Sequence, residues 1–92
     1  MAKIVVERPH TLGREVARAR AEQLAERLAS QYDLRYQWQG DVLEFKRKGA
    51  DGSIQVGDDQ VRVELSLGLL LSALGGTIKR EIEKGLDESL RG

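Results

Sequence analysis

The chain has 92 residues, 15 basic and 15 acidic side chains, and no cysteine. A chain of this length forms one domain with a thin core, because it buries only about 60–65% of the surface that its unfolded form exposes. The lack of cysteine excludes disulfides, thiol nucleophiles and cysteine-ligated zinc. The balanced charge provides no overall field for nucleic acid or anionic lipid, and the apolar share of 40% is typical of a globular domain.

No secretory signal or membrane-spanning segment is expected. The first apolar run, residues 4–6, is shorter than the roughly 7–15 apolar residues of a signal peptide. The longest uncharged run, residues 65–78, is shorter than the about 20 apolar residues of a spanning helix. We therefore expect a cytoplasmic protein.

The first expected elements are a short strand at residues 4–6 and a helix over about 12–32. Pro9 ends the strand because it has no N–H to donate. Thr11 is the expected N-cap of the helix, and Glu15 suits its positive end. The apolar side of this helix contains Val16, Ala17, Ala21, Leu24, Leu28 and Tyr32. Such a stripe predicts a helix that covers another element.

Three turn signals then predict an antiparallel meander with one apolar face. A turn at residues 40–41 pairs Trp38 with Leu43 and Tyr36 with Phe45, so that apolar side chains face each other. The opposite face is expected to be wet, because it carries Gln37, Glu44, Lys46, Gln55, Arg62 and Glu64. An antiparallel sheet with one wet face needs helices on the other face only.

The second and third turns are expected at residues 51–52 and 58–59. The third turn pairs Val56 with Val61, and the second places Ile54 on the apolar face. A shift of two residues at the third turn would preserve the faces, so that register stays open. The N-terminal strand is expected beside the strand near residues 60–67.

The C-terminal third is expected to form a short helix near residues 68–74 and a longer one near 77–90. Apolar side chains recur there every four residues, at Leu70, Leu74, Ile78, Ile82, Leu86 and Leu90. The glycines at 75–76 interrupt this stripe, and Thr77 is the expected cap of the second helix.

The resulting fold class is α+β, with the order β-α-β-β-β-β-α and a single antiparallel sheet of about five strands. An N-terminal helix and a C-terminal helix cover one face. This arrangement resembles a shortened helix-grip domain, a fold that often encloses an apolar ligand.

The residues form no recognisable catalytic, cofactor-binding or metal site. His10 is the only histidine, and without cysteine it fits no metal-ligand spacing, so we expect a loop residue. Asp58, Asp59 and Asp51 lie at predicted turns, where aspartate is favoured for its conformation. The chain lacks the glycine-rich phosphate motifs and the G-x-S-x-G motif. We therefore expect a protein without enzymatic activity.

The only basic run, residues 46–48, lies near Tyr36, Trp38 and Phe45. Aromatic side chains on a sheet with basic neighbours bind RNA in some proteins. The predicted register, however, places these rings on the helix-covered face, so we do not expect nucleic acid as a partner.

The uncharged, leucine-rich segment at residues 65–74 is the most unusual part of the chain. Leu69, Leu70 and Leu71 subtend about 200° of a helix, so they cannot all face one core. One interpretation is that the segment belongs to the core where strand turns into helix. The other is an interaction surface for an apolar partner or for a second copy in a homodimer.

Short motifs occur along nearly the whole chain, at residues 7–10, 12–13, 24–29, 34–36, 38–41, 56–59, 63–68, 70–74 and 78–83. Together they resemble the polyhydroxyalkanoic acid system protein (granule-region) family. The chain departs from the family at residues 75–77, where a charged residue, a glycine and a proline are expected.

The resemblance implies a bacterial accessory protein associated with storage-polyester synthesis or granules. It transfers no catalytic or binding residues, because none is established for the family. The hypothetical interaction surface is therefore Leu69, Leu70 and Leu71, with the polyhydroxyalkanoate granule surface or granule proteins as partners. The alternatives are a small apolar-ligand-binding module of helix-grip type and a dimeric interaction module unrelated to granules.

Overall fold

The computed structural model describes residues 2–91, apart from the side chains of Ala2 and Leu70. A strand and a helix come first, followed by four strands, a short helix and a long helix. Their bounds are β1 (Ala2–Pro9), α1 (Arg14–Tyr32), β2 (Arg35–Gln39), β3 (Val42–Arg47), β4 (Ala50–Val56), β5 (Gln60–Leu67), α2 (Leu69–Ser72) and α3 (Gly75–Ser89). This order confirms the α+β fold expected from the sequence.

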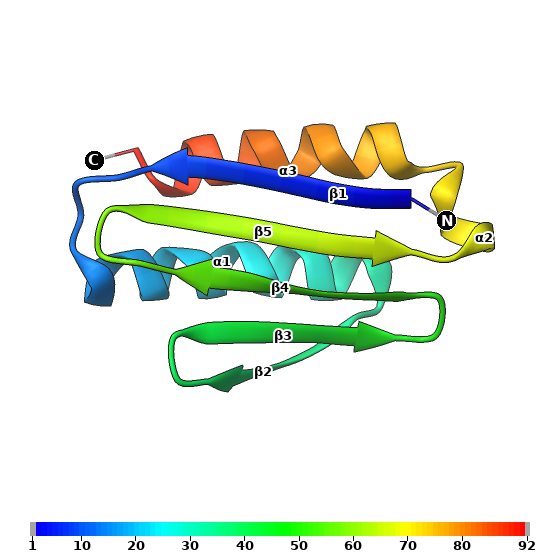
Figure 1. Cartoon of the computed structure of the whole chain (residues 1–92), viewed down its shortest axis with the longest axis horizontal. Coiled ribbons are helices and arrows are strands. Elements are labelled where there is room, and N and C mark those ends of the chain that lie inside the picture. Colours follow the sequence, from blue (N-terminus) through cyan, green and yellow to red (C-terminus); the bar gives the residue numbers. More distant parts are fainter. Residues whose placement is uncertain (1, 92) are drawn as a thin grey trace.

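The strands form one antiparallel sheet in the order β1-β5-β4-β3-β2 (Figure 1). In the β2–β3 hairpin Tyr36 lies opposite Phe45, as predicted. In the β4–β5 hairpin Val56 lies opposite Val61, which confirms the register that the sequence left open. β1 pairs with β5 along its whole length, at the expected edge. Pairing of β1 with β5 thus joins the N-terminus to a strand from the second half of the chain.

The turn between β3 and β4 corrects one prediction. It lies at residues 48–49 rather than 51–52, and Gly49 adopts a φ of 87°, which favours glycine. Gly52 instead lies inside β4, where a Cβ atom would come within 2.1 Å of the carbonyl oxygen of Glu64. Glycine is required there for close approach of two strands. The predicted faces were still right, because the two turn positions shift the pairing by an even number of residues.

The starts of both long helices also differ from the predictions. The N-cap of α1 is Gly13 instead of Thr11, because residues 10–12 form a turn held by the ring of His10. The N-cap of α3 is Leu74 instead of Thr77. Beginning the helix at Gly75 places the two glycines in its first turn and not in its interior, where glycine is most costly.

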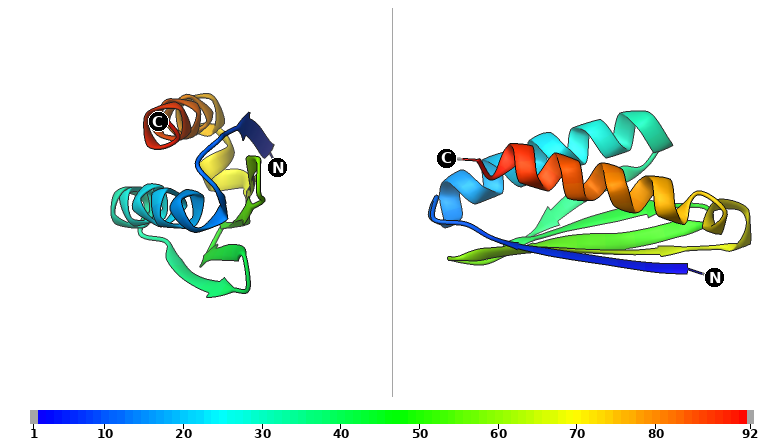
Figure 2. Two further views of the ribbon diagram at one scale, coloured as in Figure 1. Left: turned by 90° about the vertical axis from the view of Figure 1, so that its left-hand side faces the viewer. Right: turned by 90° about the horizontal axis from the view of Figure 1, so that it is seen from above.

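Both long helices lie side by side on one face of the sheet (Figure 2). The buried apolar side chains of that face and of the helices form a single core cluster. The opposite face has no helix over it and carries the predicted polar side chains, of which Gln37, Lys46 and Gln55 are exposed. The sheet therefore has one covered and one open face, as its alternating pattern predicts.

The two long helices lie close together at a glycine of α3, which leaves room for a leucine of α1. A Cβ atom on Gly85 would lie 2.5 Å from Cδ1 of Leu24. Nearby, the guanidinium of Arg20 donates to the carbonyl oxygen of Ser89 at 2.9 Å. The close contact holds α1 and α3 together over the sheet and keeps the core thin.

Candidate interaction surface

His10, the one residue considered as an acid or base, is a buried structural residue. It is 6% exposed, and its Nδ1 accepts a hydrogen bond from the backbone N–H of Leu12 at 3.2 Å. Its Nε2 therefore carries the proton and donates to the carbonyl oxygen of Gly57 at 3.0 Å. Both ring nitrogens thus bind backbone and join the β1–α1 connection to the β4–β5 turn.

The acidic residues at the turns have structural partners in α1. Arg14 lies 3.0 Å from a carboxylate oxygen of Asp41 and 3.1 Å from one of Asp58, and Arg18 lies 3.8 Å from Asp41. Among residues 2–91, no group of three or more histidine or carboxylate side chains is placed to hold a metal ion. Asp41 and Asp58 tie two hairpin ends to the first turns of α1.

The short helix α2 carries the leucines of the hypothetical surface. Leu69 is 83% exposed, and Leu74, which follows the helix, is 45% exposed. Leu71 instead packs against the core, and the side chain of Leu70 lies outside the described part of the structure. Among the side chains that the structure describes, the exposed leucines at α2 are therefore Leu69 and Leu74, and Leu71 attaches the helix to the core.

Backbone bonds position α2 at one end of the molecule. The N–H of Gly68 donates to the carbonyl oxygen of Gly49 in the β3–β4 turn at 2.7 Å. The hydroxyl of Ser72 donates back to the carbonyl oxygen of Leu69 at 3.0 Å. In Figure 1, α2 lies at the same end as the β3–β4 turn and the start of β1.

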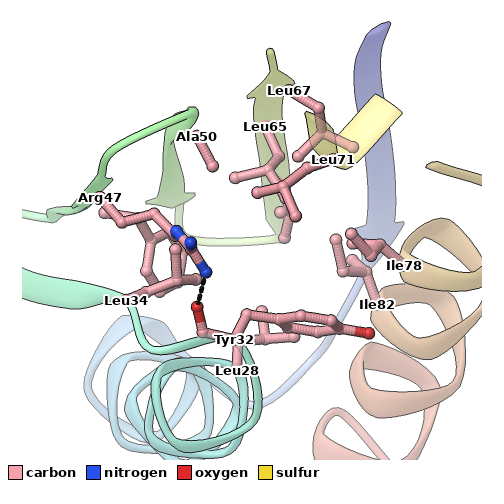
Figure 3. Close-up of a pocket in the computed structure, with 12 residues that line it drawn as sticks. Leu28, Tyr32, Leu34, Arg47, Ala50, Leu65, Leu67, Leu71, Ile78 and Ile82 are labelled. Atoms are coloured by element: carbon pink, nitrogen blue, oxygen red, sulfur yellow. Dashed lines mark hydrogen bonds between the residues drawn. The ribbon is translucent and has the colours of Figure 1, made fainter. Parts of the chain in front are cut away.

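Beneath α2, the helices and the sheet enclose a small apolar pocket (Figure 3). It is lined by Leu28, Tyr32, Leu34, Phe45, Arg47, Ala50, Val63, Leu65, Leu67, Leu71, Ile78 and Ile82. The space open to the centre of a water molecule is only about 10 Å³, close to the least that holds one water. Ligand pockets occupy about 300–1,000 Å³, so this pocket has no room for a lipid-like ligand.

Tyr32 spans the side of this pocket between α1 and α3. Its hydroxyl donates to the carboxylate of Glu81, which also accepts a bond from the amide of Gln31 at 2.8 Å. Burial of Tyr32, followed by its hydrogen bond to Glu81, raises the pKa of the phenol to about 12. The hydrogen bond from Tyr32, followed by that from Gln31, lowers the pKa of Glu81. Tyr32 therefore stays protonated and Glu81 stays ionised over a wide pH range, so the neutral phenol keeps donating to the charged carboxylate.

The aromatic side chains of the hairpin face α1, as predicted. The indole Nε1 of Trp38 donates to Glu22 at 2.7 Å, and the guanidinium carbon of Arg18 lies 4.2 Å from the ring centroid. The rings of Tyr36 and Phe45 meet edge to face, with centroids 6.4 Å apart. These rings pack under α1 and form no stacking platform on the open face.

Several of these contacts could not be found from the sequence. Trp38 and its partners Arg18 and Glu22 are on different elements, and only the i, i+4 spacing of Arg14 and Arg18 indicates a shared helix face. The Tyr32–Glu81 bond joins α1 to α3, and the strands β2 to β5 separate these two helices in the sequence. His10 belongs to no recognisable sequence motif, and its position after Pro9 gave no indication of the backbone groups that it binds.

Comparison with known proteins supplies a family and a fold. The family model described as "Putative polyhydroxyalkanoic acid system protein" matches residues 4–90. The NMR structure of PA4090 from Pseudomonas aeruginosa is similar at a TM-score of 0.53 and 8% sequence identity, covering 91% of this chain and 83% of that one. At this identity the similarity shows the fold alone. Comparison with curated proteins gives no match.

Proposed function

The chain belongs to the polyhydroxyalkanoic acid system protein family, and from this membership we propose that it is a non-enzymatic accessory protein that binds storage-polyester granules in the bacterial cytoplasm. The proposed contact is the apolar surface of Leu69 and Leu74. Family membership supports a link to the polyester system, and the exposed leucines provide the surface that such a link would use.

The exposure of Leu69 is the observation that carries the proposal. A leucine that is 83% exposed gains about 1.5–3 kcal/mol when it is buried against an apolar partner. Leu69 lies in a short uncharged helix, so no ion must be desolvated in that helix when the contact forms. A polyester surface is apolar enough to bury it.

Two observations support the part of the proposal that assigns no enzymatic activity to the protein. His10, the single histidine, is bound through both nitrogens to backbone groups. The apolar pocket under α2 has room for about one water molecule only.

No helix among residues 2–91 is long and apolar enough to cross a membrane.

The test is co-sedimentation with polyhydroxyalkanoate particles that are free of protein and lipid, at low and at high salt. Wild-type protein should sediment at both, because an apolar contact survives salt. Leu69→Asp should abolish sedimentation, whereas Val16→Asp, which changes another exposed apolar side chain (43% exposed), should not. Circular dichroism checks that both variants are folded.

No sedimentation of the wild-type protein at either salt would contradict the proposal. Sedimentation that Leu69→Asp leaves unchanged would move the contact away from α2. The same variants in sedimentation velocity would show whether Leu69 joins two copies of the chain, as in the predicted homodimer.

A further inference from the structure

We infer that the end of the molecule around α2 also docks onto anionic lipid surfaces, with Leu69 and Leu74 inserted among the acyl chains and a set of cations on the headgroups. The observation behind this inference is the gathering of basic side chains around the exposed leucines. The inference extends the proposed function to a second kind of surface, and the lipid contact does not depend on polyester.

One cation flanks α2 on the side of the β3–β4 turn. The bond from Gly68 N–H to Gly49 O brings this turn directly beside the start of α2. Lys48 precedes Gly49 and is exposed, so its side chain starts close to α2. The guanidinium of Arg47 instead donates to the carbonyl oxygens of Tyr32 and Lys48.

Two further cations flank α2 on the side of α3. Lys79 and Arg80 lie in the first two turns of that helix and are exposed. A helix rises 1.5 Å per residue, so both side chains start within about 10 Å of Leu74. Lys48 on the β3–β4 turn and the two cations at the start of α3 therefore all belong to segments that adjoin α2 (Figure 1).

Lys48, Lys79 and Arg80 form no ion pair with a carboxylate among the residues that the structure describes. At the opposite end, by contrast, arginines pair with acids, as Arg8 does with Asp87 at 2.9 Å. Of the carboxylates on the neighbouring segments, Asp51 lies opposite Lys46, and Glu81 accepts a hydrogen bond from Tyr32. The neutral chain therefore carries a local excess of positive charge around Leu69.

Apolar side chains surrounded by cations are the arrangement that binds the interface of an anionic bilayer. Single-stranded nucleic acid would need aromatic rings for stacking, and the rings of the hairpin face α1 instead. A leucine has no stacking surface, but it can enter a hydrocarbon layer. The chemistry at α2 therefore favours lipid.

The test uses vesicles of equimolar phosphatidylcholine and phosphatidylglycerol, with pure phosphatidylcholine vesicles for comparison. Binding should require phosphatidylglycerol and weaken strongly between 0.1 and 1 M salt, as the screening length falls from about 10 Å to about 3 Å. Lys48→Gln and Lys79→Gln should each weaken binding about fivefold. Leu69→Asp should weaken it about tenfold or more.

The matched control is Arg91→Gln, which removes one exposed positive charge at the opposite end of the molecule and should leave binding unchanged. Equal binding to pure phosphatidylcholine, or an equal loss in Arg91→Gln and Lys48→Gln, would overturn the inference. Binding to lipid-free polyester at high salt with no binding to vesicles would overturn it while leaving the proposed function intact. Vesicle binding without binding to polyester would contradict the proposed function and leave the lipid inference intact.

Discussion

The contact between Tyr32 and Glu81 makes the stability of the protein depend on pH at both extremes. Because the folded state raises the pKa of Tyr32 from 10.0 to about 12, the stabilisation is complete below pH 10 and is lost as the pH rises through about 12. Because folding lowers the pKa of Glu81 from 4.5, its stabilisation is present above pH 4.5 and is lost as the pH falls through the lower, folded value.

Replacing Glu81 with glutamine should therefore lower the pKa of Tyr32. The variant removes the negative charge and the strong acceptor, while burial still holds the pKa above its ordinary value. Tyrosinate absorbance during an alkaline titration measures this shift. The measurement belongs in a Tyr36→Phe background, because burial also raises the pKa of Tyr36. An unchanged Tyr32 titration would contradict the assigned role of Glu81.

His10 shows why some residues cannot be placed from the sequence. A single histidine after Pro9 was expected to be a loop residue, and it does lie between β1 and α1. Its burial depends on Gly57, which is 47 residues away in the chain. No local pattern contains that partner, because the two loops meet only when β1 pairs with β5.

At the scale of elements, the contact between α1 and α3 depends on Gly85. Replacing Gly85 with alanine places a methyl group 2.5 Å from Leu24 Cδ1, so the leucine or the helix must shift. We expect a loss of about 1–3 kcal/mol in the free energy of unfolding from overpacking. Urea denaturation followed by circular dichroism measures this loss.

The control is Gly76→Ala in the same helix. A Cβ atom there meets nothing within 4 Å, and alanine is the better helix former by up to about 1 kcal/mol. This variant should be as stable as the wild-type protein or slightly more stable. A similar change in both variants would show that helix propensity, and not the contact with Leu24, determines the effect.

Strand pairing was predictable where a turn and an alternating pattern agree. The turn at residues 40–41 fixed the β2–β3 register, because any shift by one residue would expose Phe45. The turn at 48–49 was missed because the Asp-Gly pair at 51–52 is the stronger local signal, although it serves inside a strand. Gly52 lies inside β4 because it pairs with Leu65 of β5. That partner is too far along the sequence for a local turn signal to indicate it.

The candidate surface was predictable in part. The three consecutive leucines showed that at least one must leave the core, and Leu69 is exposed while Leu71 packs inward. Which leucine faces outward depends on the bond between Gly68 and Gly49. The cations near α2 were also beyond the sequence, because residue 48 comes close to α2 only in the folded chain.

At the scale of the whole molecule, a single core should produce a single unfolding transition. Buried side chains from β1, β3, β4, β5, α1 and α3 belong to one cluster, and the partly buried Tyr36 and Trp38 of β2 pack against it, so no part can keep its core when the rest unfolds. Trp38 reports on the edge strand β2 and its contact with α1, whereas far-ultraviolet circular dichroism reports on the helices. The two denaturation curves should therefore coincide, and separate midpoints would contradict a single domain.

The position of β1 has a consequence for anything joined to this chain. Ala2 lies opposite Leu67, so the start of β1 adjoins α2, while the end of α3 lies at the far end of the molecule (Figure 1). A protein fused ahead of β1 would emerge beside Leu69 and obstruct it. A protein fused after α3 would instead emerge at the far end and leave the exposed side chain of Leu69 free.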